Sequence, residues 1–407
     1  MRTITEELAR MAPVFPKVEY QERLTRLRQK MNEQGLSLLV VANPANINYI
    51  SGYDAMTYQN TQALLVPSAD LDPVWVGRAV DVICAQETTW LSADNIVGYA
   101  EVYADNYPNH PMEAVAGEIK KRGWSTGRIG YEGDAFYFSV RGFFTLQKNL
   151  PGPELVDVGV LVNWLRTIKS PREIEFMRRA AKIADKVMGI AVDSLKPGIR
   201  ENDYAARIVQ AQIEGDQEFG ASYPTGTPFI QTGKHAGMVH APWTTDVIDD
   251  GSITVMEFGG CYFRYNAGIA RTVTLGKPSD RLTRLASTVH EGHAAALAVM
   301  KPGVTCHDVW AAWQAVLEPS GFKKHTRIGY TLGLNYHPTW REYTASLERG
   351  RKDELREGMC FHLLCGMWTG DGTIKGDPNY CISETVLVTK NGAETLTNLE
   401  RKLFVKQ

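Results

Sequence analysis

The sequence predicts two domains, a small α/β domain followed by a larger α+β domain that is built from two similar halves. A length of 407 residues exceeds what a single small core usually requires. Strand-like and helical patterns alternate over the first part of the chain. Further on, the order helix, Lys-Pro-Gly, helix, strands occurs twice, which indicates an internal duplication with pseudo-two-fold symmetry. We expect the domains to span residues 1–165 and 166–407.

The first domain begins with a helix over 16–35, because Tyr20, Leu24, Leu27 and Met31 recur at helical spacing before Gly35. A buried strand over 37–42 follows, and then a turn at 43–46. The remaining elements alternate between strand and helix: strands 63–66 and 73–77, helices 81–90 and 111–122, strand 128–131, helix 139–149 and strand 155–157. This order favours a mostly parallel or mixed sheet.

The second domain begins at Ser170-Pro171, where proline in the first turn and Glu173 behind it are typical of a helix start. We expect helices over 172–194, 201–213, 279–300 and 305–317. Between them, Ile253–Phe258 and Tyr262–Tyr265 read as two strands joined by a Gly-Gly turn, and a further run ends near residue 275.

Composition excludes several classes of function. Apolar content of 44%, 22% charged residues and a net charge of −2 are ordinary for a soluble protein and favour neither nucleic acid nor an anionic membrane as partner. The chain has no apolar run of ~18 residues, and its charged N-terminus lacks the apolar core of a signal peptide. Six cysteines without a C-x-x-C motif indicate reduced thiols, so we expect a cytoplasmic protein.

Glu257 is the residue that does not suit a buried strand, because it stands within Val-Met-Glu-Phe-Gly. An ionised carboxylate among apolar neighbours is costly unless it is paired or used in chemistry. Two interpretations follow: a structural ion pair with a residue such as Arg271, or a functional carboxylate.

The stretch Ile253–Gly276 resembles the metal-binding hairpin of the creatinase/prolidase/methionine-aminopeptidase superfamily, with Arg271-Thr272 at the family's terminal Arg-Thr. The segment that starts at Arg166 (R-x-I-K-S-P-x-E) resembles the entry into the family's catalytic domain. The resemblance implies an α/β N-terminal domain and an α+β "pita-bread" C-terminal catalytic domain.

Metalloenzymes of this superfamily hold two cations with two aspartates, one histidine and two glutamates. The matching positions in this sequence are Glu257, Gly268, Tyr330, Leu364 and Ser383. Hard divalent cations favour carboxylate ligands, and only one acid remains. The resemblance therefore implies a branch without metal or other cofactor, as in creatinase, which hydrolyses a C–N bond.

Motifs over most of the chain are similar to the ectoine-hydrolase branch, and they lie at Asn43–Asp54, His110–Met112, Val162–Arg166, Glu257–Tyr265 and Gly329–Tyr336. The chain departs from this branch at Asn266-Ala267, His337 and Thr339. The resemblance implies a hydrolase that opens the cyclic amidine of ectoine or hydroxyectoine, a small zwitterion, to N-acetyl-2,4-diaminobutyrate. A downstream deacetylase would then be a partner.

The same resemblance assigns roles to individual residues. Glu257 is expected to be the nucleophile or base, and His240 the shuttle that protonates the leaving nitrogen. Glu384 is expected to hold the amidinium or to orient His240. The alternative for His240 is a solvated loop histidine.

Further candidates line the expected pocket. Trp243, Tyr330, Tyr336, Trp340 and Trp368 suit either an aromatic pocket for a delocalised cation or core packing. His362 suits either the pocket or the core. By resemblance, Tyr53-Asp54 binds substrate from the partner of a homodimer. His290 and His293 could share a metal, but an exposed helix face is the favoured interpretation.

Two rival functions stay open. One is creatinase-like hydrolysis of a linear guanidino acid. The other is a catalytically inactive pita-bread domain that acts as a binding module, although such a module has no need of an acid and a base at Glu257 and His240.

Overall fold

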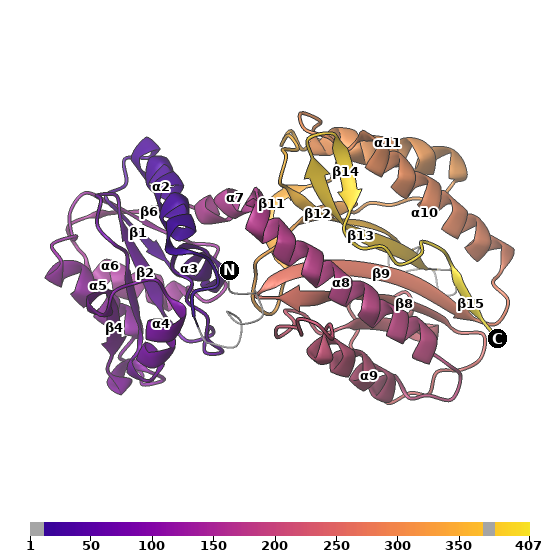
Figure 1. Cartoon of the computed structure of the whole chain (residues 1–407), viewed down its shortest axis with the longest axis horizontal. Coiled ribbons are helices and arrows are strands. Elements are labelled where there is room, and N and C mark those ends of the chain that lie inside the picture. Colours follow the sequence, from indigo (N-terminus) through magenta and orange to yellow (C-terminus); the bar gives the residue numbers. More distant parts are fainter. Residues whose placement is uncertain (1–11, 369–378) are drawn as a thin grey trace. The chain divides into compact units, whose positions relative to one another are not determined.

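A computed structural model describes residues 12–368 and 379–407. The chain divides into two compact units, Met1–Arg166 and Thr167–Gln407, drawn in Figure 1. The first is an α/β unit and the second an α+β unit, so the predicted fold class is confirmed. No helix of the described residues is long and apolar enough to cross a membrane.

Over the described residues, unit 1 holds a six-stranded mixed sheet in the order β4-β3-β2-β1-β5-β6. Its strands are β1 Leu38–Val41, β2 Ala63–Pro67, β3 Val74–Arg78, β4 Ile96–Tyr99, β5 Arg128–Tyr131 and β6 Glu154–Asp157. The pairs β1·β5, β5·β6 and β3·β4 are parallel, whereas β1·β2 and β2·β3 are antiparallel. The mixed sheet expected from the alternating pattern is therefore present.

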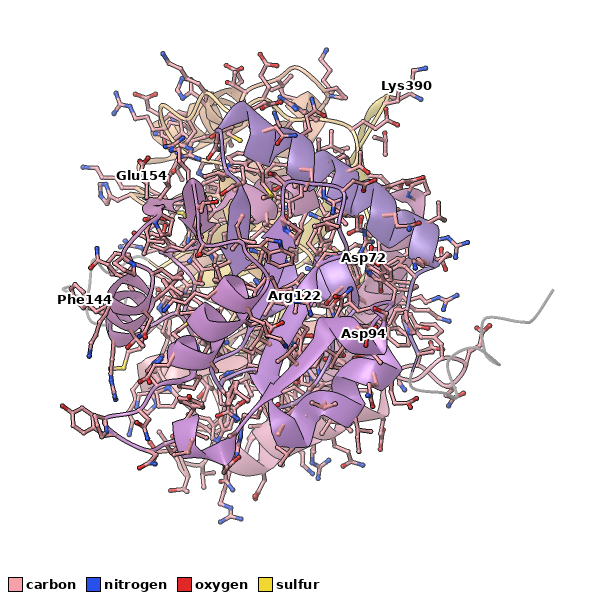
Figure 2. The ribbon with its side chains drawn as sticks, turned by 90° about the vertical axis from the view of Figure 1, so that its left-hand side faces the viewer. Asp72, Asp94, Arg122, Phe144, Glu154 and Lys390 are labelled. Carbon is pink, nitrogen blue, oxygen red and sulfur yellow. The ribbon has the colours of Figure 1, made fainter. Side chains whose placement is uncertain are left out.

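The helices of unit 1 are α2 Lys17–Glu33, α3 Pro44–Ser51, α4 Val82–Thr88, α5 Pro111–Lys121, α6 Val140–Asn149 and α7 Leu161–Thr167. Short 3₁₀ turns lie at η1 Ala79–Asp81, η2 Ala93–Asn95 and η3 Glu101–Tyr103. In Figure 2, Arg122 at the C-terminal end of α5 reaches the turn at Asp94, to whose carbonyl it donates at 2.7 Å.

The prediction of a simple turn at 43–46 was wrong, because α3 begins there. The Asn43 side chain accepts from the Ala45 N–H at 2.9 Å, and Pro44 occupies the first helical position. Every residue of α3 is buried. Burial on all sides removes the amphipathic period by which a helix is recognised in a sequence.

Unit 2 contains α8 Pro171–Ser194, α9 Glu201–Glu214, α10 Asp280–Val299, α11 Cys306–Ser320 and the 3₁₀ turn η4 Gly233–His235. Ser170 caps α8 in a reciprocal capping box with Glu173, as the Ser-Pro-x-Glu pattern predicts. In Figure 1, α8 lies along β8 and β9, while α10 lies beside β12 and β13. Each half thus packs a long helix on its own pair of strands, in the predicted repeat.

The described part of unit 2 holds a nine-stranded sheet with the path β11-β10-β12-β13-β9-β8-β7, to which β14 and β15 are added. Its strands are β7 Phe229–Thr232, β8 Ile253–Tyr262, β9 Tyr265–Leu275, β10 Gly329–Leu332, β11 Arg341–Ser346, β12 Cys360–Met367, β13 Tyr380–Thr389, β14 Gly392–Thr395 and β15 Phe404–Lys406.

The predicted Gly-Gly turn in the central hairpin was wrong. Strand β8 runs through Gly259-Gly260, and the turn lies at Phe263-Arg264, both with positive φ. A Cβ on Gly260 would lie 2.2 Å from the Ala180 carbonyl oxygen of α8. Glycine is therefore needed there for the close approach of a helix and not for a reversal of the chain.

Candidate active site

A cavity of about 1010 Å³ opens within unit 2, and Glu257 is part of its wall. Strand register explains why this carboxylate faces inward: Glu257 pairs with Ala270, and Ala270 with Ser383. Residues directly opposite one another on neighbouring strands share a face of the sheet. Glu257, Ala270 and Ser383 therefore face the same side.

The Glu257 side chain is held in poorly hydrated surroundings, with the residue only 8% exposed. Burial raises its pKa to about 7, and the positive charge of Lys324 opposes this rise. The expected alternative, an ion pair with Arg271, is not formed: Arg271 Nη2 donates to Glu384 Oε1 at 2.7 Å on the other side of the sheet.

His362 on β12 is the polar neighbour of Glu257. Its Nδ1 lies 3.9 Å from Glu257 Oε1 and 3.2 Å from Tyr330 Oη, and its Nε2 lies 2.6 Å from Ser383 Oγ. Burial lowers the pKa of His362 to about 3, so the ring is neutral at neutral pH. The 3.9 Å contact is thus between a carboxylate and a neutral imidazole.

The His362 ring also fills the space above Gly268. A Cβ at this glycine would lie 3.0 Å from His362 Nε2. Gly268 is the position at which the family pattern carries its second aspartate. The imidazole thus occupies the volume that a longer side chain at 268 would need.

Tyr330 and Trp340, two of the predicted aromatic residues, lie in the cavity wall. Trp340 Nε1 donates to Tyr330 Oη at 3.1 Å. The Trp340 ring stands perpendicular to the His362 ring at 5.6 Å. Trp368 also lines the cavity.

His240 reaches the cavity from the loop after η4. Its ring lies edge-on to that of Phe229 at 5.4 Å, and Phe229 is the residue opposite Glu257 in the β7·β8 pair. His240 is exposed, and within the described residues it makes no hydrogen bond to Glu257. The predicted acid and base therefore share one cavity without direct contact.

A cluster of cations around the cavity was missed by the sequence analysis, and it comprises Arg281, Lys323, Lys324, Arg327 and Arg341. The guanidinium groups of Arg327 and Arg341 lie 4.9 and 5.2 Å from the Tyr330 ring. Among the described residues of the wall, Glu257 is the single carboxylate. The basic run 323–327, directly before the Gly329-Tyr330 motif, was the available signal.

Three predicted site residues lie elsewhere in unit 2. Glu384 is fully buried on the opposite face, where it binds Arg271 and Thr397 Oγ1, so its expected role at the substrate was wrong. Tyr336 is buried beneath the Arg264 guanidinium, 4.7 Å away, outside the cavity wall. Trp243 lies in a shallow groove along α9.

Tyr53 and Asp54 belong to unit 1. Tyr53 is 2% exposed, and its ring lies 4.9 Å from that of Trp75. The Asp54 N–H donates to Thr88 Oγ1 at 3.2 Å. Their expected role in the pocket of a partner subunit stays a prediction.

The donor set does not suit a pair of divalent cations. At the five positions that the family pattern uses for metal, a single carboxylate is found, Glu257. The described residues contain no group of three or more His, Cys, Asp or Glu side chains that could hold a metal ion. His290 and His293 do not form the expected exposed face: His290 Nε2 lies 2.5 Å from Tyr380 Oη, and His293 is 2% exposed.

Comparisons with known proteins agree with this architecture. Residues 23–168 match the creatinase/prolidase N-terminal domain, and residues 175–390 match metallopeptidase family M24. Among solved structures, a prolidase from Thermococcus sibiricus superimposes with a TM-score of 0.82 at 22% identity, over 95% of this chain and 99% of that one.

Curated relatives extend over nearly the whole chain. An uncharacterized hydrolase/peptidase, y4tM, of Sinorhizobium fredii is 38% identical over 393 residues, 96% of this chain and 98% of the relative. The ectoine hydrolase of Halomonas elongata is 36% identical over 399 residues, with the same coverage. A creatinase from a Bacillus species is 26% identical over 95% of this chain and 92% of the relative.

Proposed function

The chain belongs to the creatinase/prolidase family with a metallopeptidase M24 domain, and from this premise we propose that it is a metal-independent hydrolase that opens the amidine ring of ectoine or hydroxyectoine. The product would be N-acetyl-2,4-diaminobutyrate. One observation carries the proposal: among the described residues of the cavity wall, the poorly hydrated Glu257 is the single carboxylate, and the other charged side chains there are cations.

The Glu257 end of the cavity suits the amidine. With a pKa near 7, this carboxylate is partly ionised at neutral pH and basic enough to take up a proton. It would attack the electrophilic amidine carbon or activate a water molecule for that attack. His240, exposed on the same cavity, would deliver a proton to the departing nitrogen.

Two arginines of the cavity wall suit the substrate's carboxylate. Arg327 and Arg341 present two guanidinium groups against Tyr330, and a guanidinium fork matches the geometry of a carboxylate. A zwitterion would place its amidine at Glu257 and its carboxylate at these arginines. The Trp340 ring, which also lines the cavity, suits a delocalised cation.

The test is incubation of the purified protein with ectoine, hydroxyectoine and creatine, with products detected by mass spectrometry. We expect ring opening of one of the cyclic substrates, unchanged by chelators and lost in Glu257→Gln. Two tightly bound metal ions per chain together with loss of activity on chelation would overturn the metal-independent mechanism. Hydrolysis of neither cyclic substrate would overturn the proposed substrate.

The second candidate is hydrolysis of a linear guanidino acid. A creatinase is among the relatives, and a guanidinium that carries a carboxylate suits the same Glu257 and the same two arginines. Turnover of creatine but not of ectoine in the same assay would favour it. Tight binding of either compound without turnover would favour an inactive binding module.

A further inference from the structure

Lys324 is a cation of the cavity wall to which the proposed mechanism gives no role. It lies in the segment before β10, and its Nζ donates to the Gly366 carbonyl at 2.5 Å. The same ammonium lies 5.4 Å from the centre of the Trp368 ring. Among the described residues of the cavity wall the one carboxylate is Glu257, whose contact within 4.0 Å is with His362 and not with Lys324. A partly buried ammonium is thus held by a carbonyl and an aromatic face, and no carboxylate of the described cavity wall contacts it.

The charge states of the groups around Glu257 show which of them can influence its ionisation. Among the described residues, the ionisable side chains that interact with Glu257 are Tyr330 on β10, His362 on β12, Cys381 on β13 and Lys324 before β10. Arg327 and Arg341 lie against the Tyr330 ring. Burial raises the pKa of Tyr330 and of Cys381 and lowers that of His362, so these three are neutral at neutral pH. His240 lies beyond Phe229. Within the part of the chain that the structure describes, Lys324 shares the cavity wall with Glu257 and favours its ionised form.

The loss of solvation of the Lys324 ammonium also indicates that this residue has a role. Burial lowers the pKa of Lys324, because an ammonium in poorly hydrated surroundings loses solvation. Glu257 and Lys324 each oppose the shift that burial imposes on the other. Lys324 and Glu257 line the same cavity without forming an ion pair within the described residues, so a ligand can contact both charges.

We propose that Lys324 is the internal counter-charge of Glu257: its ammonium favours the ionised carboxylate and thereby sets the pH above which the enzyme is active. This inference rests on the proposed role of Glu257 as nucleophile or base. Lys324 acts through Glu257 and is a positioning residue. The carboxylate it stabilises is the form that can attack or accept a proton.

The first test is the pH profile of kcat/KM between pH 5 and 9 on the cyclic substrate. In wild type we expect the acid limb near pH 7, where Glu257 ionises. In Lys324→Met, which keeps the apolar stem against Trp368, the limb should move up by roughly one pH unit. Activity would then fall roughly tenfold at pH 6 and little at pH 9.

Two further variants serve as controls. Lys324→Arg keeps the positive charge and should retain the wild-type limb. Lys323→Met removes the neighbouring charge, whose side chain is exposed, and should leave the position of the limb unchanged. A Lys324→Met limb that coincides with wild type, or an equal shift in Lys323→Met, would overturn the proposal.

A second readout does not depend on turnover. The difference in unfolding free energy between wild type and Glu257→Gln, measured against pH, reports the pKa of Glu257 through proton linkage. Repeated in the Lys324→Met background, its midpoint should move to higher pH. If no substrate is hydrolysed, the proposed function fails while this measurement still decides the role of Lys324. A midpoint that is the same in the Lys324→Met background as in wild type would refute the role of Lys324.

Discussion

At the scale of single residues, burial pushes the two polar groups at the centre of the site toward neutrality. The pKa of Glu257 is raised to about 7 and that of His362 lowered to about 3. Above pH 7 the carboxylate is therefore charged while the imidazole beside it is not. Within the described residues Glu257 has no cationic partner in contact, which leaves its charge available for a cationic substrate.

The raised pKa of Glu257 has a consequence for stability. The pKa of this carboxyl is near 4.5 in the unfolded chain and about 7 in the folded protein. The folded protein therefore loses stability as the pH rises from 4.5 to 7, because the buried group must give up its proton. Glu257→Gln should therefore be more stable than wild type at pH 8, by up to roughly 3 kcal/mol, and nearly equal at pH 4.5. Urea unfolding at the two pH values measures this. The prediction is contradicted if the difference in unfolding free energy between Glu257→Gln and wild type is the same at both pH values.

Glu257 and His240 should behave as one catalytic unit, although they are not in contact. Either Glu257→Gln or His240→Ala should lower kcat by at least ~10²-fold, and the double variant should lose little more than the worse single one. A double-mutant cycle of kcat/KM measures the coupling. Multiplicative losses, or near-normal turnover in either single variant, would mean that another pair performs the chemistry.

At the scale of elements, the site depends on how closely α8 packs on the central hairpin. Gly260 of β8 lies against the α8 backbone at Ala180, and β8 carries Glu257 three residues earlier. The same helix contacts β8 and β9 along their length (Figure 1). Helix and hairpin thus hold the Glu257 backbone in place.

Gly260→Ala should destabilise the protein by about 1–3 kcal/mol, because its Cβ would lie 2.2 Å from the Ala180 oxygen and α8 would have to move. Gly189→Ala is the matched control: it lies within α8 with nothing within 4 Å of the new Cβ, and it should be neutral or stabilising by up to ~1 kcal/mol. Denaturant unfolding compares the two. Equal changes in stability for the two variants would show that the close packing of α8 on β8 does not require glycine at position 260.

At the scale of the whole molecule, the cavity and its reactive groups lie in unit 2, and unit 1 contains Tyr53 and Asp54. Family resemblance predicts a homodimer in which this pair belongs to the partner's site. Symmetric dimers place the same surfaces in contact in both directions, so each site would take residues from both chains.

Light scattering should therefore give twice the chain mass, and Asp54→Ala should lower activity. Co-expression of Asp54→Ala with Glu257→Gln chains tests the sharing of sites: half of the dimers are mixed, and each mixed dimer has one intact site. About a quarter of wild-type activity should return. A fully active monomer, or no recovery from two folded but inactive variants, would refute shared sites.

The sequence by itself was sufficient to predict the order of the domains and the long helices, and to identify Glu257 as an unusual carboxylate in an apolar strand. Helical period and capping are local properties, so α2 and α8 could be recognised from the residues alone. Only the tertiary structure decided which face of β13 meets the cavity: Ser383 faces His362, whereas Glu384 faces Arg271. It also placed Lys324 and Glu257 in the wall of one cavity and moved the hairpin turn beyond Gly260. Each of these depends on strand register and on contacts between distant segments, which no local pattern encodes.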